Sequence, residues 1–316
     1  MRTQAVLLAG DRAHSKAVRG LSKSFIEIDG RPMVVHVLEA LLRTPEISEV
    51  FVVGNVPRLE KAIAEHRCLR LAAARSRGVH VVPQRETLFE NIWNTFLRTL
   101  PPDGPVEDHP ILIVPADIPL VLPEEISDFV RQAVALEADY VIGLSPDTAL
   151  ARFAPTEADP GVRMASFNVA EGRLRQNNLH YVRPLRMGNR HYIQDMYENR
   201  YQKQFGSVLA LAWRMLVKEF RHLWVLGFYL LMHLAGVFER HGFVWASDRV
   251  RARVSLATVE RGIGELLDTR VRTAVTMLGG AAVDIDNAPD LAAAEKMIGP
   301  WKTMQLRIAR TAALGR

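Results

Sequence analysis

The stretch Gln4-Ala5-Val6-Leu7-Leu8-Ala9-Gly10 is a short apolar run that ends in glycine. Such a run is typical of a buried strand in a parallel sheet, because helices cover both faces of that sheet. Helices are expected where apolar residues recur at helical spacing, at 33–42, 58–67, 88–100 and from Pro123. Similar apolar runs predict further strands at 49–55, 78–84, 111–114, 139–144 and 274–278. This alternation predicts an α/β fold with a mostly parallel sheet covered on both faces.

The composition is that of a globular protein. Of the 316 residues 48% are hydrophobic, which excludes a disordered chain. Cys68 is the only cysteine, so the sequence excludes a disulfide framework and argues against a cysteine-rich metal site. The first residues lack the long apolar core and the cleavage site of a signal peptide, so we expect a cytoplasmic protein.

The chain carries a formal net charge of +5 that is not concentrated in one block of lysines and arginines. A nucleic-acid partner is therefore not expected. A moderate positive field suits an anionic small substrate, such as a nucleotide or a sugar phosphate, and equally an anionic membrane surface. Charge alone does not choose between these partners.

Two segments at the ends of predicted strands carry residues suited to phosphate chemistry. Gly10 lets backbone amides approach a phosphate, and Lys23 offers a positive point charge, although both also fit an ordinary surface loop. Asp117 follows the 111–114 strand at the edge where open α/β sheets bind ligands, and its carboxylate suits Mg²⁺. A helix cap or a turn is the alternative for Asp117.

A second pair of acids, Asp284 and Asp286, precedes an apparent helix start at Pro289. Asp286 or Asn287 therefore suits a helix cap. If this segment lies beside the 111–114 strand, one of the two acids could instead face Asp117 across a cation.

Four motifs occur in order along the chain: Leu8-Ala9-Gly10, Lys23 before Ile28-Asp29-Gly30-Arg31-Pro32-Met33, Ala116-Asp117-Ile118-Pro119-Leu120, and the run 283–291. Together they resemble the sugar-phosphate nucleotidyltransferases, and within these the molybdenum-cofactor-guanylyltransferase-like NTP transferases. The resemblance covers about residues 1–145 and 270–298. It implies a three-layer Rossmann-like nucleotidyltransferase fold, of the glycosyltransferase-A type. It also implies transfer of an NMP unit from an NTP to a phosphorylated acceptor, with release of pyrophosphate.

The resemblance also implies roles for individual residues. Lys23 and Asp117 would be catalytic, and Asp117 and Asp286 would bind Mg²⁺ as the cofactor. The residues expected to contact the nucleotide are Ala9, Gly10, Arg12, Lys23, Gln84, Thr87 and Asn91. Lys16 and Arg19 compete with Arg12 for the role of the family's loop arginine, and Asp11 stands where the family usually has a second glycine. For Thr87 a helix cap, and for Asn91 an ordinary polar helix position, are equally good interpretations.

Five regions follow from these patterns: a nucleotide-binding core at 1–145, an acceptor-binding region at 146–206, an apolar helical insertion at 207–250, a return to the core at 251–299 with the second metal carboxylate, and a basic tail at 300–316. In the polar region, Arg175 and Asn178 are the candidates for binding a sugar or polyol phosphate, with a solvated loop as the alternative.

The apolar residues 207–246 are too few, and too interrupted by His233, for a membrane span. They suit a buried insertion or homodimer interface, or an amphipathic pair lying peripherally on the inner face of the membrane.

A magnesium-dependent nucleotidyltransferase is thus the leading hypothesis. A glycosyltransferase that uses a nucleotide-sugar is a second one, although the Asp-x-Asp metal site of that class is missing after the 111–114 strand. A third is a catalytically degenerate nucleotide-binding module that docks a membrane or a partner through 207–246.

Overall fold

The computed structural model describes residues 2–10, 22–66, 69, 78–101, 106–189, 245, 249 and 254–314. The predictions for Arg12, Lys16 and Arg19 lie outside the described residues, and so does the 207–250 insertion apart from Trp245 and Arg249.

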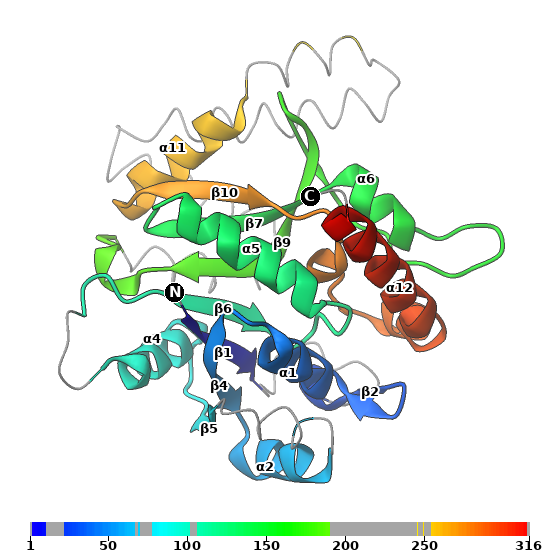
Figure 1. The fold of residues 1–316 in the computed structure, drawn as a ribbon, viewed down its shortest axis with the longest axis horizontal. Coiled ribbons are helices and arrows are strands. Elements are labelled where there is room, and N and C mark those ends of the chain that lie inside the picture. Colours follow the sequence, from blue (N-terminus) through cyan, green and yellow to red (C-terminus); the bar gives the residue numbers. More distant parts are fainter. Residues whose placement is uncertain are drawn as a thin grey trace.

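A single twisted sheet forms the centre of the fold, with the strand order β10-β7-β9-β6-β1-β4-β5 and β8 paired to β9 (Figure 1). Its strands are β1 (Thr3–Ala9), β4 (Ile47–Gly54), β5 (Gly78–Pro83), β6 (Ile111–Pro115), β7 (Tyr140–Pro146), β8 (Phe167–Val169), β9 (Gly172–Val182) and β10 (Val271–Val275). A separate small sheet pairs β2 (Glu27–Ile28) with β3 (Arg31–Pro32).

The central sheet is mostly parallel, as predicted. β6, β1, β4 and β5 run in one direction, and β10 is parallel to β7. β9 is inserted between β6 and β7 and is antiparallel to both. The first residues of β9 therefore lie at the edge where the parallel strands end, with Arg175 opposite Ser145 of β7. This register brings a segment from the polar region to the ligand-binding edge of the sheet.

Helices cover both faces of the sheet and complete three layers. On one face, a single apolar cluster joins Leu38 of α1, Leu59 of α2 and Phe129 of α5 to the strands. On the other face, Phe96 of α4 and Leu267 of α11 pack on Val6 and its neighbours. The helices are α1 (Met33–Arg43), α2 (Val56–Glu65), α4 (Leu88–Thr99), α5 (Pro123–Ala135), α6 (Asp147–Leu150), α11 (Leu256–Leu267) and α12 (Ala288–Leu314). Short 3-10 helices are η1 (Lys23–Phe25), η2 (Ala151–Phe153), η3 (Pro184–Arg186) and η5 (Gly280–Ala282).

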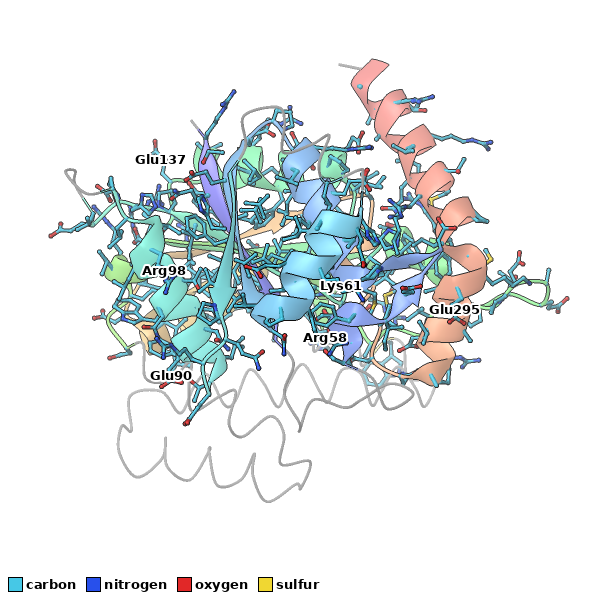
Figure 2. The ribbon with its side chains drawn as sticks, turned by 90° about the horizontal axis from the view of Figure 1, so that it is seen from below. Arg58, Lys61, Glu90, Arg98, Glu137 and Glu295 are labelled. Atoms are coloured by element: carbon cyan, nitrogen blue, oxygen red, sulfur yellow. The ribbon has the colours of Figure 1, made fainter. Side chains whose placement is uncertain are left out.

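The long helix α12 lies at the side of the sheet toward which the arrows of β6 and β10 point (Figure 1). Seen from below, α12 with Glu295 and α4 with Glu90 and Arg98 lie at opposite sides, and α2 with Arg58 and Lys61 lies between them (Figure 2). The ends of the parallel strands thus face a region bordered by α12. Within the described ranges, no helix has both the length and the apolar composition that crossing a bilayer requires.

Several element predictions need correction. The last strand is Val271–Val275 and not 274–278. The segment 147–163 contains α6 and η2, neither of which was predicted. Arg175 and Asn178, for which a solvated loop was the alternative, lie inside β9. Within the predicted basic tail, 300–316, the described residues up to Leu314 continue α12 past Pro300.

Candidate active site

The carboxyl ends of β1, β4 and β6 form the base of the site. The amide of Ala116 donates to the carbonyl of Leu8 (3.0 Å), so the chain leaves β1 at Gly10 and β6 at Asp117 from neighbouring positions. Gln84 follows β5 and its amide donates to the Gly54 carbonyl (3.1 Å). A Cβ added to Gly10 would stand 3.8 Å from Oε1 of Gln84. The predicted phosphate turn, metal carboxylate and base-reading residue therefore share one edge of the sheet.

Gly54, at the end of β4, was not singled out from the sequence. A Cβ at this position would stand only 2.6 Å from the Ala9 carbonyl oxygen and 3.1 Å from Cδ1 of Leu59. Glycine is thus required for β1 and β4 to end side by side, directly below Gly10. The available signal was a glycine at the end of an apolar strand, which alone is too common to identify the position.

A small apolar cluster brings three of the four sequence motifs together. Ile26 and Ile28 beside the β2–β3 turn, Leu120 after Asp117, and Val283 and Ile285 all belong to it and are buried. The amide of Ile285 also donates to the carbonyl of Asp117 (2.9 Å). The acid-bearing segment, residues 283–286, is therefore attached to the end of β6. This adjacency is the condition that the sequence analysis set for a cation shared by Asp117 and one of the two acids. The apolar residues alternate with Asp284 and Asp286, which lie outside this cluster.

Lys23 and Asp286 form an ion pair across the site. The Lys23 Nζ lies 2.5 Å from Oδ1 of Asp286, and the lysine side chain is 16% exposed against 53% for the aspartate. Lys23 is held in η1, whose Phe25 ring lies 4.1 Å below the guanidinium carbon of Arg58. Asp286 is not the cap of α12, because Asn287 accepts the hydrogen bond from the Asp290 amide (2.9 Å). The carboxylate of Asp286 is thus directed to Lys23.

Burial raises the pKa of Asp117 to about 6, against the opposing effect of Lys23 and with further increases from Asp284 and Asp286. The pKa of Asp290 is also raised, mainly by burial. The site thus contains four carboxyl groups, those of Asp117, Asp284, Asp286 and Asp290. Two cationic side chains lie among them: Lys23, and Arg175, whose Nη2 lies 2.7 Å from Oδ1 of Asp284. The carboxylates outnumber the cations, so the site favours an additional positive charge.

The donor set fits a hard divalent cation that shares its ligands with a substrate. In the part of the chain that the structure describes, no three His, Cys, Asp or Glu side chains converge closely enough to hold a metal ion by themselves. Mg²⁺ is usually held by one or two carboxylates together with water and substrate phosphates. Asp117 and Asp286 are the carboxylates that could contribute here.

Three of the predicted nucleotide and acceptor residues are used within the fold. Thr87 is the N-cap of α4, and Glu90 closes a capping box with it. Oδ1 of the buried Asn91 accepts from the Arg85 amide (2.5 Å). Nδ2 of Asn178 donates to the Ala281 carbonyl (2.9 Å). For Thr87, the sequence analysis left a helix cap as an alternative to nucleotide binding, and the structure shows the cap.

Arg175 holds the acid-bearing segment. Besides Asp284, its guanidinium donates from Nε to the Ala282 carbonyl (3.2 Å) and from Nη1 to the Ala165 carbonyl (3.1 Å). It lies at the predicted edge of the sheet, but its hydrogen bonds go to the protein itself. Acceptor binding by Arg175 and Asn178 stays a prediction.

Comparison with known families identifies the first half of the chain. Residues 5–155 match the model of the MobA-like NTP transferase domain. This segment belongs to the MobA-like NTP transferases. The resemblance predicted from the motifs is confirmed, and so is the enzyme class, a nucleotidyltransferase.

Solved structures similar to this chain were also found. A hypothetical transferase structure from Thermus thermophilus is 24% identical, with a TM-score of 0.56 over 92% of this chain and 100% of that chain. This similarity concerns the fold and agrees with the predicted Rossmann-like class.

Two more distant structures were found as well. CMP:2-keto-3-deoxy-manno-octonic acid synthetase complexed with CTP is 13% identical, with a TM-score of 0.47 over 95% of this chain and 99% of that chain. 4-diphosphocytidyl-2C-methyl-D-erythritol synthase from Anaerococcus prevotii DSM 20548 is 12% identical, with a TM-score of 0.46 over 94% and 96%. The comparison with curated proteins found no match.

The family match does not cover the whole candidate site. Gly10, Lys23 and Asp117 lie within the matched residues 5–155, whereas Arg175, Asp284 and Asp286 lie beyond them. The second half of the chain therefore supplies the carboxylates that surround Asp117.

Proposed function

We propose that this protein transfers an NMP unit from an NTP to a phosphorylated small molecule, a sugar or polyol phosphate, and releases pyrophosphate. The observation that carries the proposal is the convergence of the Gly10 turn, Lys23, Asp117 and Asp286 at one edge of the sheet. The confirmed transferase class supplies the reaction type, and the acceptor and the Mg²⁺ requirement are our additions.

In the proposed reaction, an oxygen of the acceptor phosphate attacks the α-phosphorus of the NTP. A new P–O bond forms while the bond from the α-phosphorus to the bridging oxygen breaks, and pyrophosphate leaves with the bonding electrons. The acceptor oxygen is largely ionised near neutral pH, since the second pKa of a phosphate monoester is about 6, so it needs no general base. The task of the protein is to position two polyanions and to offset their charge.

Each site residue has a part in that task. The backbone at Ala9 and Gly10 accommodates the triphosphate without side-chain obstruction. Lys23 offsets phosphate charge, for which its ammonium group moves from Asp286 to the substrate. Asp117 and Asp286 would hold Mg²⁺, which supplies charge neutralisation on the departing pyrophosphate. Gln84, beside Gly10, is the remaining candidate for contact with the base.

A phosphorylated acceptor is supported by the cationic groups at this edge. Arg173 and Arg175 lie at the start of β9, beside the ends of the parallel strands. Arg173 is 43% exposed, and its Nε lies 3.6 Å from Oδ2 of Asp147. An exposed guanidinium near the carboxylates suits a phosphate that has to approach a negatively charged site.

The test is acceptor-dependent release of pyrophosphate by purified protein supplied with Mg²⁺, the four NTPs and a panel of sugar and polyol phosphates. Asp117→Asn should reduce the rate by at least about 100-fold, because it removes one cation ligand and its charge. Asp128→Asn on α5 is the matched control, since its carboxylate accepts from Gln132 (3.0 Å) away from the site. No pyrophosphate with any NTP would refute the proposal, and nucleotide-sugar hydrolysis instead would favour the glycosyltransferase alternative.

A further inference from the structure

The carboxylate of Glu125 is completely buried in the first turn of α5, and the proposed reaction does not use it. Its side chain is 0% exposed, so it cannot touch a substrate. Burying a carboxylate is costly unless hydrogen bonds compensate the loss of water. The contacts that compensate Glu125 therefore indicate what the residue does.

The groups that donate hydrogen bonds to this carboxylate lie on one segment, residues 276–281. Thr276 Oγ1 donates to Oε1 (2.9 Å), the Gly279 amide donates to Oε1 (3.0 Å), and the Ala281 amide donates to Oε2 (2.9 Å). This segment connects β10 to Asp284 and Asp286. Glu125 thus holds the chain a few residues before the acids of the site.

The same segment is held from its other side by β9. Asn178 donates to the Ala281 carbonyl, and Arg175 donates to the Ala282 carbonyl and to Asp284. Glu125 and Asn178 therefore bind the amide and the carbonyl of the same residue, Ala281. Glu125 holds the backbone of the segment from one side, and β9 holds its backbone and the Asp284 carboxylate from the other. The segment therefore has little freedom to shift.

The segment also follows a path that few sequences allow. Gly279 has φ 85°, in the left-handed region, and a Cβ added to Gly280 would stand 2.4 Å from the Leu120 carbonyl oxygen. Such a path leaves backbone amides pointing into the protein, where each needs an acceptor. A carboxylate offers two oxygens to these donors, whereas a glutamine of the same shape offers one.

We propose that Glu125 is a positioning residue of the nucleotidyl-transfer site, and that its carboxylate fixes residues 276–286 so that Asp284 and Asp286 face Asp117. The inference rests on the proposed function, because it assigns these acids to the site of the cation and the triphosphate. It makes two measurable statements: Glu125 controls the order of the segment, and it thereby controls affinity for a divalent cation with a triphosphate.

The test uses full-length Glu125→Gln with two measurements that need no turnover. Binding of Mn²⁺ tripolyphosphate, followed by water-proton relaxation enhancement, should weaken by at least about tenfold, as for other residues that orient metal ligands. Hydrogen exchange should become faster by about tenfold or more at the amides of Gly279, Ala281 and Ile285, which this segment keeps bonded.

Ser127→Ala is the matched control. It removes a buried hydrogen bond from the same helix, since Ser127 Oγ donates to Oε2 of Glu46 (2.7 Å), but that bond lies away from the segment. It should change neither the binding of the probe nor exchange at the three amides. If Glu125→Gln does not fold, Thr276→Val removes one bond to the same carboxylate and should change both readouts in the same direction.

The outcomes separate this inference from the proposed function. Wild-type affinity and wild-type exchange in folded Glu125→Gln, or equal changes in Ser127→Ala, would overturn the positioning role. Wild-type protein that binds no Mn²⁺ tripolyphosphate and releases no pyrophosphate would overturn both. If the wild type is catalytically active and Glu125→Gln matches it in probe binding and hydrogen exchange, only the positioning role is overturned.

Discussion

The two glycines at the ends of β1 and β4 should respond in opposite ways to the same substitution. A Cβ at Gly54 would stand 2.6 Å from the Ala9 carbonyl oxygen, and real Cβ atoms do not approach closer than 3.0 Å, so Gly54→Ala must move β4 from β1 by at least about 0.4 Å. A Cβ at Gly10 meets nothing closer than Oε1 of Gln84 at 3.8 Å, an ordinary contact. The first change overpacks the core, whereas the second adds a methyl group at the surface.

The expected magnitudes follow from this difference. Overpacking costs about 1–3 kcal/mol, and the loss of glycine entropy in the unfolded chain returns about 0.4–1 kcal/mol. Gly54→Ala should therefore lower the free energy of unfolding, by up to about 2.6 kcal/mol. Gly10→Ala should leave it unchanged or raise it by up to about 1 kcal/mol. In binding, the new methyl group of Gly10→Ala would occupy the position proposed for the triphosphate and weaken its affinity by about tenfold or more.

Urea denaturation and titration with Mn²⁺ tripolyphosphate measure the two effects separately on the same preparations. The reasoning about the strand ends would be refuted if Gly54→Ala were as stable as wild type. The reasoning about the phosphate turn would be refuted if Gly10→Ala bound the probe as tightly as wild type.

Three further predictions concern single side chains. Burial lowers the pKa of His36 to about 3, so between pH 6.5 and 3 only the unfolded chain gains this proton and stability falls as the pH falls. From pH 7 to 4.5 the loss in the free energy of unfolding is about 3 kcal/mol. His36→Gln should remove this loss in urea denaturation, and an equal dependence of stability on pH in the variant and the wild type would contradict the prediction. Thr87→Ala should lower the free energy of unfolding by about 1 kcal/mol because it opens the capping box, and an unchanged urea midpoint would contradict this. Lys23→Gln should raise the pKa of Asp117 further, and carboxyl-carbon NMR titration showing no increase would contradict the electrostatic argument.

Local patterns predicted the architecture well where each element has its own signal. The strands at β1, β4, β5 and β6 and the helices α1, α2, α4 and α5 follow from apolar runs and helical spacing, and the structure moves their ends by only a few residues. The first half of β9 has no such signal, because it is mostly polar and because Arg175 and Asn178 bond to the 281–284 segment. Its antiparallel insertion depends on contacts that no local pattern contains.

The candidate site was predictable only as a set of motifs. The order of the four motifs indicated Gly10, Lys23, Asp117 and Asp286. The structure brings them to one edge because β1 and β6 end side by side and because Ile26, Leu120 and Ile285 share a cluster. Gly54 and Glu125 escaped notice because each depends on a partner far away in sequence: the Ala9 carbonyl for Gly54, and the amides of Gly279 and Ala281 for Glu125. In the sequence, a glutamate in the first turn of a helix is explained by a favourable interaction with the helix dipole, so nothing indicates that it is buried.

The ion pair between Lys23 and Asp286 joins residues that are 263 positions apart, and this separation has a consequence for biosynthesis. A ribosome delivers residues 5–155, the recognised transferase segment, long before the acids near its end emerge. During that interval Lys23 and Asp117 have no carboxylate from the second half beside them, and Ile26 and Leu120 lack the apolar partners that later cover them. A nascent chain therefore cannot form the Lys23–Asp286 ion pair until translation has passed residue 286.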